Sequence, residues 1–278
     1  MNEVRRDFSP QALAAANEAN MFEAYASLGR LSGNDLYDGP DHIRLYTGVP
    51  YPLLNGVFRA QLAPGDIDGT IQRLLKHFVD RNVPMLWWTG PATRPADLGT
   101  KLLEHGLRHA WDSPGMAVDL ETLAEGPVPP GLTVKRVDDT ETLRAWTRPF
   151  GVGFGFPDVA VAAAFEFFSR DGFGPRAVWR HYLGWKNAQP VACSSMFLAA
   201  GVAGIYGVAT TPEARRLGIG AALTVAPLRE ALAIGYRIGI LQSSAIGLGV
   251  YRQIGFQVCC TIGHYLWAPS QTGDTTNA

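Results

Sequence analysis

The stretch of the chain best suited to chemistry is residues 215–220, which read Arg-Arg-Leu-Gly-Ile-Gly. It follows the uncharged apolar run 202–209, and apolar spacing beyond it predicts a helix. A strand that leads through a glycine turn into a helix leaves several backbone N–H groups unpaired, and the helix dipole adds positive potential there. Gly218 and Gly220 carry no Cβ that would keep a large anion away, and the two arginines add charge. These residues therefore predict a phosphate-binding site.

Two other phosphate-binding patterns do not fit this stretch. A P-loop requires Lys after its second glycine, and no Lys follows Gly220. A dinucleotide-binding fingerprint requires a third glycine three residues later, where the chain has Leu223. The pattern that remains is Arg-x-x-Gly-x-Gly, filled by Arg215, Gly218 and Gly220.

This pattern resembles the acyl-CoA pyrophosphate loop of the GNAT superfamily of N-acetyltransferases. In that family a Tyr-x-x-x-Gly-Phe segment follows on the next helix, and Tyr251, Gly255 and Phe256 match it. The resemblance implies a GNAT fold and acyl transfer from acetyl-CoA or another acyl-CoA. No metal is expected.

The resemblance also implies which residues hold the acyl-CoA. Beside Arg215, the pyrophosphate would bind the backbone N–H groups of six residues, namely Arg216, Leu217, Gly218, Ile219, Gly220 and Ala221. The pantetheine arm would pair with a strand that splays from its neighbour, at Val208, Ala209 and Thr210. Ser244 stands where the family often has Asn, so its contact with the pantetheine would have a shorter reach.

Two residues are expected to act on the thioester. The backbone N–H of Val208 would polarise the carbonyl, and the hydroxyl of Tyr251 would return a proton to the departing thiolate. An ordinary phenol is protonated at neutral pH and can donate that proton. The alternative interpretation is that Val208 is a core strand residue and that Tyr251 packs a helix.

The general base cannot be identified from the sequence. Candidates that could face the acceptor pocket, or could equally be surface or structural residues, are Glu166, Asp158, Asp171, His181 and Tyr206. Tyr206 is the best placed, on the strand that leads to the thioester, and a water chain is an alternative. Cys193 is expected to be a buried packing residue, so an acyl-enzyme through Cys193, Cys259 or Cys260 is not predicted. Aromatic residues could line an acceptor pocket or fill the core, the interpretation we favour, and are Phe154, Phe156, Phe165, Phe167, Phe168 and Trp185.

Composition limits the possible partners. A net charge of −1 argues against a nucleic-acid partner, which requires a basic face. Three cysteines, two of them adjacent, cannot form a disulfide framework and favour a cytoplasmic protein with reduced thiols. Residues 190–212 carry no charge but are interrupted by glycines, which favours two buried strands over a membrane helix. The first ten residues are charged and lack a secretion signal.

The Pro- and Gly-rich residues 126–131 are the predicted linker between two units, 1–125 and 132–270, followed by a flexible tail, 271–278. In the second unit we predict helices after Asp138 or Asp139, over 160–168, after Gly220 and over 245–253. Its predicted strands are 132–137, 176–185, 190–199, 202–210, 237–242, 256–262 and 264–267. The first unit repeats this ending, with a helix over 66–82, a strand over 84–89 and a closing strand pair over 109–120. Residues 61–70 lack the Arg-x-x-Gly-x-Gly pattern, so this degenerate copy is not expected to bind acyl-CoA.

The sequence therefore predicts an α/β protein with a tandem GNAT fold, in which each half has a mixed, mostly antiparallel sheet flanked by helices. Its predicted function is acetyl transfer from acetyl-CoA to a small-molecule amine by direct attack in a ternary complex. The alternatives are a non-catalytic acyl-CoA sensor and acyl transfer to a thiol or hydroxyl. A monomer or a homodimer is expected, and the acceptor and the acyl-chain preference stay open.

Overall fold

The computed structural model of the chain describes residues 3–31, 35–124, 126, 128–174 and 177–269. The helices in these residues are α1 (Pro10–Arg30), α2 (Ile67–Val79), α3 (Leu98–Glu104), α4 (Thr140–Phe154), α5 (Asp158–Asp171), α6 (Ile219–Ala233) and α7 (Leu248–Gln253). Short 3₁₀ turns are η1 (Pro52–Leu54), η2 (Pro64–Asp66) and η3 (Pro212–Ala214).

The strands belong to one sheet of eleven strands. They are β1 (Asp35–Asp38), β2 (Ile43–Tyr46), β3 (Asn55–Phe58), β4 (Met85–Thr89), β5 (Arg108–Asp119), β6 (Leu132–Arg136), β7 (Trp179–Lys186), β8 (Gln189–Ala199), β9 (Val202–Thr210), β10 (Ile238–Gln242) and β11 (Gln257–Trp267). Their order is β1-β2-β3-β4-β11-β5-β10-β9-β8-β7-β6. The two parallel pairs, β3–β4 and β9–β10, each lie inside one half of the chain.

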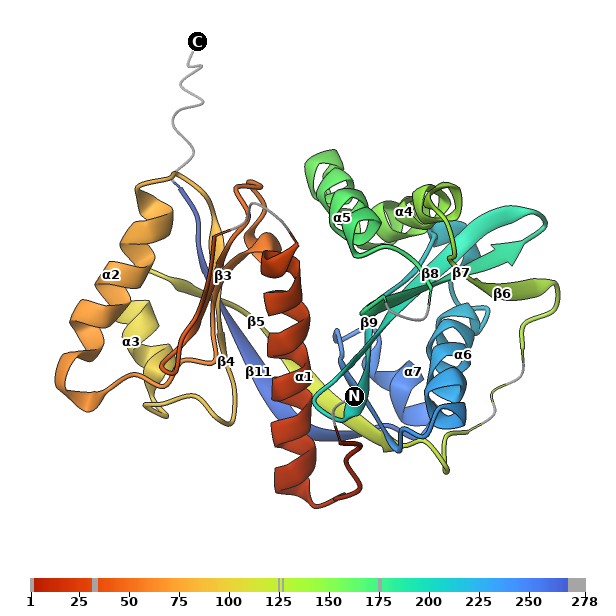
Figure 1. The fold of residues 1–278 in the computed structure, drawn as a ribbon, viewed down its shortest axis with the longest axis horizontal. Coiled ribbons are helices and arrows are strands. Elements are labelled where there is room, and N and C mark those ends of the chain that lie inside the picture. Colours follow the sequence, from red (N-terminus) through yellow and green to blue (C-terminus); the bar gives the residue numbers. More distant parts are fainter. Residues whose placement is uncertain (1–2, 32–34, 125, 127, 175–176, 270–278) are drawn as a thin grey trace, which may run out of the picture.

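The two halves exchange strands at the centre of this sheet (Figure 1). β5, from the first half, lies between β10 and β11, and β11, from the second half, lies between β4 and β5. The predicted closing pair over 109–120 was wrong, because that segment is one strand, and so was the break between 256–262 and 264–267. Each long strand completes the other half's sheet, so neither half needs a closing pair of its own. The division at 126–131 stays a prediction, and residues 125 and 127 lie outside the described residues.

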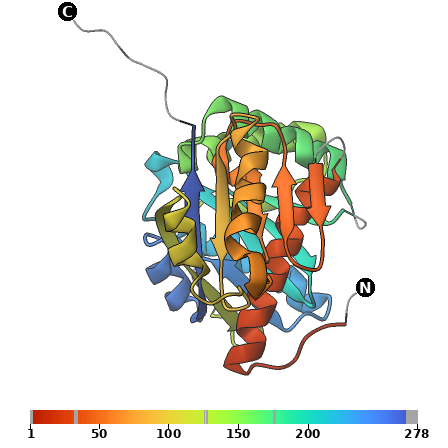
Figure 2. The same cartoon turned by 90° about the vertical axis from the view of Figure 1, so that its left-hand side faces the viewer.

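Helices cover both faces of the sheet. Alternation along β4 separates the two sides, since Leu86 and Trp88 pack against α1 whereas Met85 and Trp87 pack against α2 and α3. Figure 2 shows α2 and α3 lying over the strands of the first half. In the second half, α4 and α5 lie on the same face of the sheet as α1, and α6 and α7 lie on the same face as α2 and α3.

Local signals in the sequence explain several helix boundaries. Asp139 caps α4 with a capping box, since its carboxylate accepts the Thr142 N–H at 2.7 Å, and α4 ends at left-handed Gly155. Ser9 caps α1, with Pro10 in the first turn. α1 itself was not predicted, because its apolar residues form no single stripe and it is buried on several sides.

α1 also joins the halves through buried amides. The side-chain nitrogen of Asn20 donates to the carbonyls of Phe197 and Ala199, and that of Asn17 donates to those of Met116 and Leu241. Because a buried amide without a partner is costly, these bonds hold α1 in register across strands from both halves.

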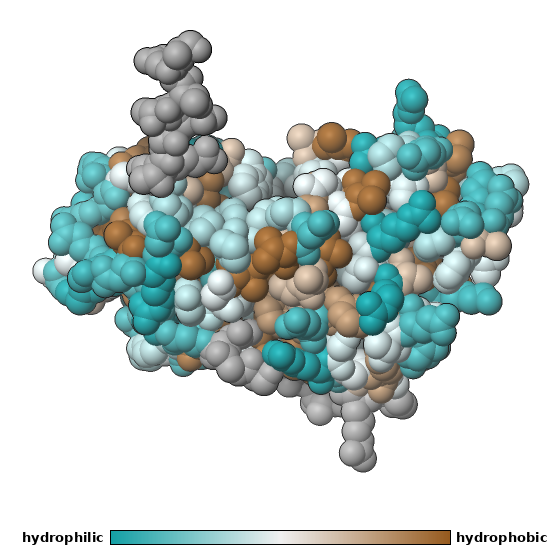
Figure 3. Space-filling model, turned by 90° about the horizontal axis from the view of Figure 1, so that it is seen from above, coloured by the Kyte–Doolittle hydropathy of each residue, from teal (hydrophilic) through white to brown (hydrophobic). Residues whose placement is uncertain are grey.

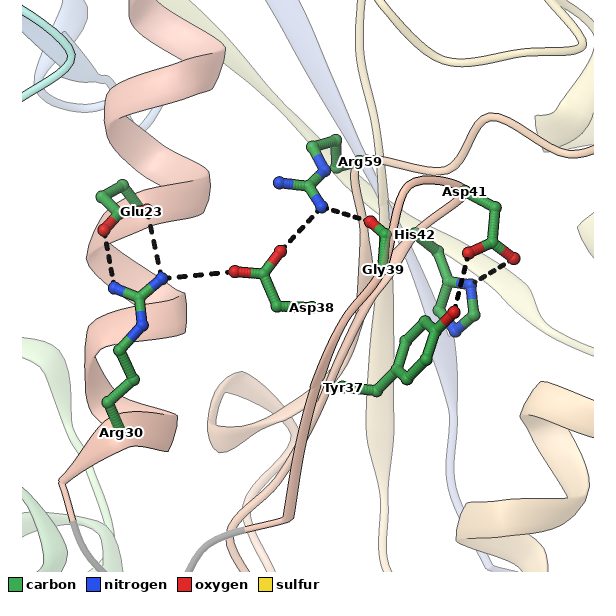
Figure 4. A network of polar contacts seen from close by, with 8 residues as sticks. All are labelled: Glu23, Arg30, Tyr37, Asp38, Gly39, Asp41, His42 and Arg59. Carbon is green, nitrogen blue, oxygen red and sulfur yellow. Dashed lines mark hydrogen bonds and ion pairs between the residues drawn. The ribbon is translucent and has the colours of Figure 1, made fainter.

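The far end of α1 is tied to the first half by surface charges (Figure 4). Arg30 pairs with Glu23 at 2.6 Å and with Asp38 at 3.3 Å, and Asp38 in turn pairs with Arg59 at 2.7 Å. Such exposed pairs each stabilise a fold by about 1 kcal/mol or less. Each of these four charged side chains has a partner within the cluster, so we interpret the cluster as an anchor for α1.

None of the helices in the described residues is both long and apolar enough to cross a membrane.

Candidate functional site

The parallel strands β9 and β10 separate part of the way along their length. Their pairing is limited to Ala203 with Gly239 and Gly204 with Ile240. Beyond Gly204, β9 pairs with β8 alone. A bulge there places two residues of β9, Gly207 and Val208, opposite the single residue Ser194 of β8. The edge of β9 that faces β10 is therefore open at the position predicted for the pantetheine arm.

A cavity of about 660 Å³ occupies this opening. Its walls come from both faces of the sheet, since Leu241 and Tyr251 belong to the α6–α7 side and Trp146 belongs to the α4–α5 side. A cavity can pass through a sheet in this way only where two strands are not hydrogen-bonded to each other. Val208 and Ser244 line it as well, so the structure brings Val208, Tyr251 and Ser244 together, as the sequence predicted.

Tyr251 is placed by packing. It lies on α7, one of its ring edges meets Phe256 with centroids 6.0 Å apart, and it leaves no room for a side chain at Gly247. Burial raises the pKa of Tyr251 to about 12, so its hydroxyl stays a proton donor through the neutral range. Ser244 has a local role too, because its hydroxyl accepts the Gly247 N–H at 3.2 Å and helps to start α7.

The predicted phosphate loop lies between η3 and α6. Gly218 is the N-cap residue of α6, and its φ of +76° is a conformation that favours glycine. No side chain caps this helix, and the N–H groups of Ile219, Gly220 and Ala221 belong to its first turn, where a helix supplies no internal acceptor. An anion can take these three donors.

Arg215 has partners within the protein. Its guanidinium donates to the carbonyls of Thr210 at 3.3 Å and Gly153 at 2.9 Å, so it ties the loop to the end of β9 and to α4. Arg216 and Leu217 are exposed. Ala209 and Thr210 pair with Cys193 and Ala192 of β8. None of the five predicted residues Ala209, Thr210, Arg215, Arg216 and Leu217 lines the cavity. They lie between Val208, which does line it, and the start of α6.

The five predicted candidates for the general base differ in whether they reach the cavity. Asp158 and Glu166 are exposed on α5, and Asp171 accepts the Trp179 N–H at 2.9 Å, so none of the three lines the cavity. Tyr206 lines it, but its hydroxyl donates to Asn20 at 2.7 Å and burial raises its pKa well above the usual value.

His181 is the fifth candidate and reaches the cavity only through a neighbour. Its Nδ1 lies 2.7 Å from the hydroxyl of Ser195, which lines the cavity. Burial, with a smaller contribution from Arg136, lowers the pKa of His181 to about 3. An imidazole this weakly basic does not hold a proton at neutral pH, so His181 positions Ser195.

Sequence reasoning missed the wall that the first half supplies. Tyr25, Tyr51 and Trp88 line the cavity from the first half, and His264 lines it from β11. Gln242, also at the wall, donates to Asn17 of α1 at 2.7 Å. His264 reaches the cavity on the exchanged strand β11, and Tyr25 reaches it on α1, which packs across both halves; no local pattern in the sequence encodes either arrangement.

The six aromatic residues singled out in the sequence of the second half differ in whether they line the cavity. Phe154, Phe156, Phe167 and Phe168 line the cavity, whereas Phe165 and Trp185 do not. Phe167 and Phe168 are buried members of the core as well, and Phe165 and Trp185 pack against it, so the favoured interpretation as core filling describes four of the six.

None of the three thiols lines the cavity, although contact with Cys260 lowers the pKa of Cys259. Cys193 is fully buried and burial raises its pKa, which opposes formation of a thiolate. Cys259 and Cys260 are unpaired, and neither lines the cavity. Within the described residues, no group of three or more His, Cys, Asp or Glu side chains could hold a metal ion.

Comparison with solved structures identifies the fold. A GCN5-related N-acetyltransferase from Kribbella flavida has a TM-score of 0.70 and 20% identity, with 91% of this chain and 97% of that chain covered. Another from Sphaerobacter thermophilus has a TM-score of 0.61 and 19% identity, with 94% of each chain covered. A tandem GNAT protein from the clavulanic acid biosynthesis pathway has a TM-score of 0.60 and 15% identity, with 97% and 98% covered.

Sequence comparisons give no such match: no protein-family model and no curated protein matches the chain. The structural likenesses span nearly the whole chain and establish that it has the GNAT fold in its tandem form. The predicted fold is confirmed.

Proposed function

We propose that the protein is an acetyl-CoA-dependent N-acetyltransferase that transfers the acetyl group to an amine by direct attack in a ternary complex. The observation that carries this proposal is the cavity through the opening between β9 and β10, which both Val208 of β9 and Tyr251 of α7 line. That opening lets a thioester and an amine meet from opposite faces of the sheet.

The chain's own backbone would hold the acetyl-CoA. The free N–H groups at the start of α6 suit the pyrophosphate, because they combine unpaired donors with the positive end of the helix dipole. The open edge of β9 suits the amide-bearing pantetheine, which can pair as a further strand would. The corresponding helix of the first half, α2, begins with Asp66 and Asp68, which repel a phosphate, so one acetyl-CoA site per chain is proposed.

The proposed chemistry needs few groups. Bound acetyl-CoA supplies the activated carbonyl, and the N–H of Val208 polarises it. The hydroxyl of Tyr251 protonates the sulfur as it leaves, a step for which a neutral phenol in a buried site is suited. Neither Asp158, Glu166 nor Asp171 lines the cavity, and Asp112, which does, has its carboxylate against His109, so no carboxylate base is assigned.

The second candidate is an acyl-CoA sensor without turnover, favoured by the short reach of Ser244 and by the absence of an assigned base. Acylation of a thiol or hydroxyl is a further alternative. The cytoplasmic location and the oligomeric state stay predictions.

The test is a transfer assay with acetyl-CoA and a panel of primary amines, in which free thiol and acetylated amine are measured together. The proposal predicts equimolar release of CoA thiol and N-acetyl product, above the rate of thioester hydrolysis without amine. Binding of acetyl-CoA with no amine-dependent thiol release would support the sensor, and product formed only with thiols or alcohols would reassign the acceptor.

A further inference from the structure

The wall of the cavity is aromatic on both sides of the junction between the halves. Rings reach it from the first half, including Tyr25, Tyr51 and Trp88, and from the second half, including Trp146, Phe154 and Phe156. They contact one another across the junction, since the Tyr51 and Phe156 centroids are 5.4 Å apart. At about 660 Å³ the cavity would hold the end of the pantetheine arm with its acetyl group and still leave room for a second substrate.

The cavity has its own opening to solvent. Phe154 and Trp111 line it while staying 46% and 40% exposed, which places them at its mouth. Figure 3 shows hydrophobic side chains gathered near the middle of the face seen from above, the side on which α4 and α5 lie in Figure 1. An opening of this kind would admit an acceptor to a ternary complex, whereas an acyl chain attached to CoA would need only a closed tunnel.

The wall carries little charge. Among the described lining residues Asp112 is the one with a charged side chain. It pairs with Gly263 in the ladder, so its carboxylate points to the sheet face opposite Ser113 and Trp111, where it lies 2.9 Å from His109. The remaining titratable groups at the wall are neutral at pH 7: His264, whose pKa burial lowers to about 4, and Tyr25, Tyr51, Tyr206 and Tyr251, whose pKa values burial raises.

We propose that the acceptor is an amine with a large aromatic or aliphatic body, which occupies this cavity as the neutral free base. The inference deepens the N-acetyltransferase proposed above and rests on it for the reaction. An ammonium group inside this neutral wall would lack a counter-charge, so burial favours the unprotonated amine. That amine is already nucleophilic, and no carboxylate base is required.

The bonds and protons balance in such a transfer. The amine lone pair forms the new C–N bond, and the C–S bond breaks. The nitrogen gives up one proton, and the sulfur gains one from Tyr251, which is reprotonated in turn. The net change moves one proton from nitrogen to sulfur and needs no oxidant or further reactant.

The test compares phenethylamine and octylamine with ethanolamine, whose amino group is similar but whose body is small and polar. We expect kcat/KM from free-thiol release to be at least tenfold higher for the two hydrophobic amines. At pH values below the pKa of the amine, the KM for total phenethylamine should fall about tenfold for each unit by which the pH is raised, because only the free base binds. Saturation-transfer NMR with phenethylamine alone measures its binding without turnover.

Phe154→Ala is the informative variant, because its side chain lies at the mouth and half exposed, where truncation leaves the core intact. We expect it to lower kcat/KM for phenethylamine at least fivefold while that for ethanolamine changes little. Phe165→Ala is the matched control, since Phe165 lies on α5 against Arg144 and does not line the cavity.

Equal rates for ethanolamine and phenethylamine would overturn the inference and leave the acetyltransferase standing. So would a preference for octanoyl-CoA over acetyl-CoA with no preference among amines, which would assign the cavity to an acyl chain. If NMR shows that phenethylamine binds and that Phe154→Ala weakens this binding, but no acetylated product forms, the result would support the cavity assignment and overturn the proposed reaction.

Discussion

At the scale of single residues, Tyr251 carries the sharpest prediction. Tyr251→Phe keeps the ring and its contact with Phe256 and removes only the hydroxyl. General acid catalysis typically contributes a factor of about 10² to 10⁴, so the single-turnover rate constant should fall at least tenfold with little change in acetyl-CoA affinity. Because the pKa of Tyr251 is raised to about 12, its ionisation should cause no loss of rate below about pH 11.

Single-turnover measurement is needed because slow product release would hide a chemical defect. Tyr206→Phe is the comparison, since Tyr206 also lines the cavity but its hydroxyl is held by Asn20. An unchanged rate constant in Tyr251→Phe would make Tyr251 a packing residue, and the Val208 N–H and proximity would then carry the reaction.

Residue identity alone predicted part of the site. Gly218 and Tyr251 follow a pattern of type and spacing that a sequence displays directly, whereas Val208 was placed through the resemblance to the GNAT family. His181 could not be judged in this way, because its burial and its contact with Ser195 arise from packing between β7, β8 and the aromatic rings around them.

At the scale of elements, most of the second half was predictable because its helices and strands have clear caps and apolar runs. α1 was not, since its Ala-rich sequence shows no stripe and its buried polar residues, Asn17 and Asn20, find partners only on distant strands. The long strands β5 and β11 were predicted as pairs because the sequence does not reveal that each one's partner comes from the other half.

The strand exchange predicts that the halves do not unfold separately. Removing β5 would expose the edges of both β10 and β11, so residues 130–278 alone should aggregate. The intact chain should show one calorimetric transition, with van't Hoff and calorimetric enthalpies in agreement.

Coexpression of residues 1–129 and 130–278 is the control for the fragment, because it restores every strand of the sheet. A soluble, monomeric 130–278 fragment with a cooperative transition, or two separate transitions in the intact chain, would show that the exchanged strands are not needed for either half to fold.

At the scale of the whole molecule, the two halves have different proposed roles. The second half supplies the helix start, the open strand and the Tyr251 hydroxyl. The first half supplies aromatic rings at the cavity wall. It also supplies α1, whose Asn20 and Asn17 accept hydrogen bonds from Tyr206 and Gln242. The acidic start of α2 opposes phosphate binding in the first half, so we propose that this duplicated fold carries one active centre.

The central claim is that one acetyl-CoA binds per chain at the start of α6, and calorimetry tests it most directly. We expect the wild-type protein to bind one acetyl-CoA per chain, and Gly218→Glu to weaken binding at least 100-fold, or about 2.7 kcal/mol, by placing a carboxylate beside the pyrophosphate. A Cβ at Gly218 would have its nearest neighbour 3.6 Å away, so the cost to the fold is limited to the backbone strain at φ of +76°. Gly106→Glu, at φ of +84° in open space in the first half, carries similar strain and should bind like the wild type. Equal affinity in Gly218→Glu and Gly106→Glu, or two acetyl-CoA molecules per chain, would contradict the account.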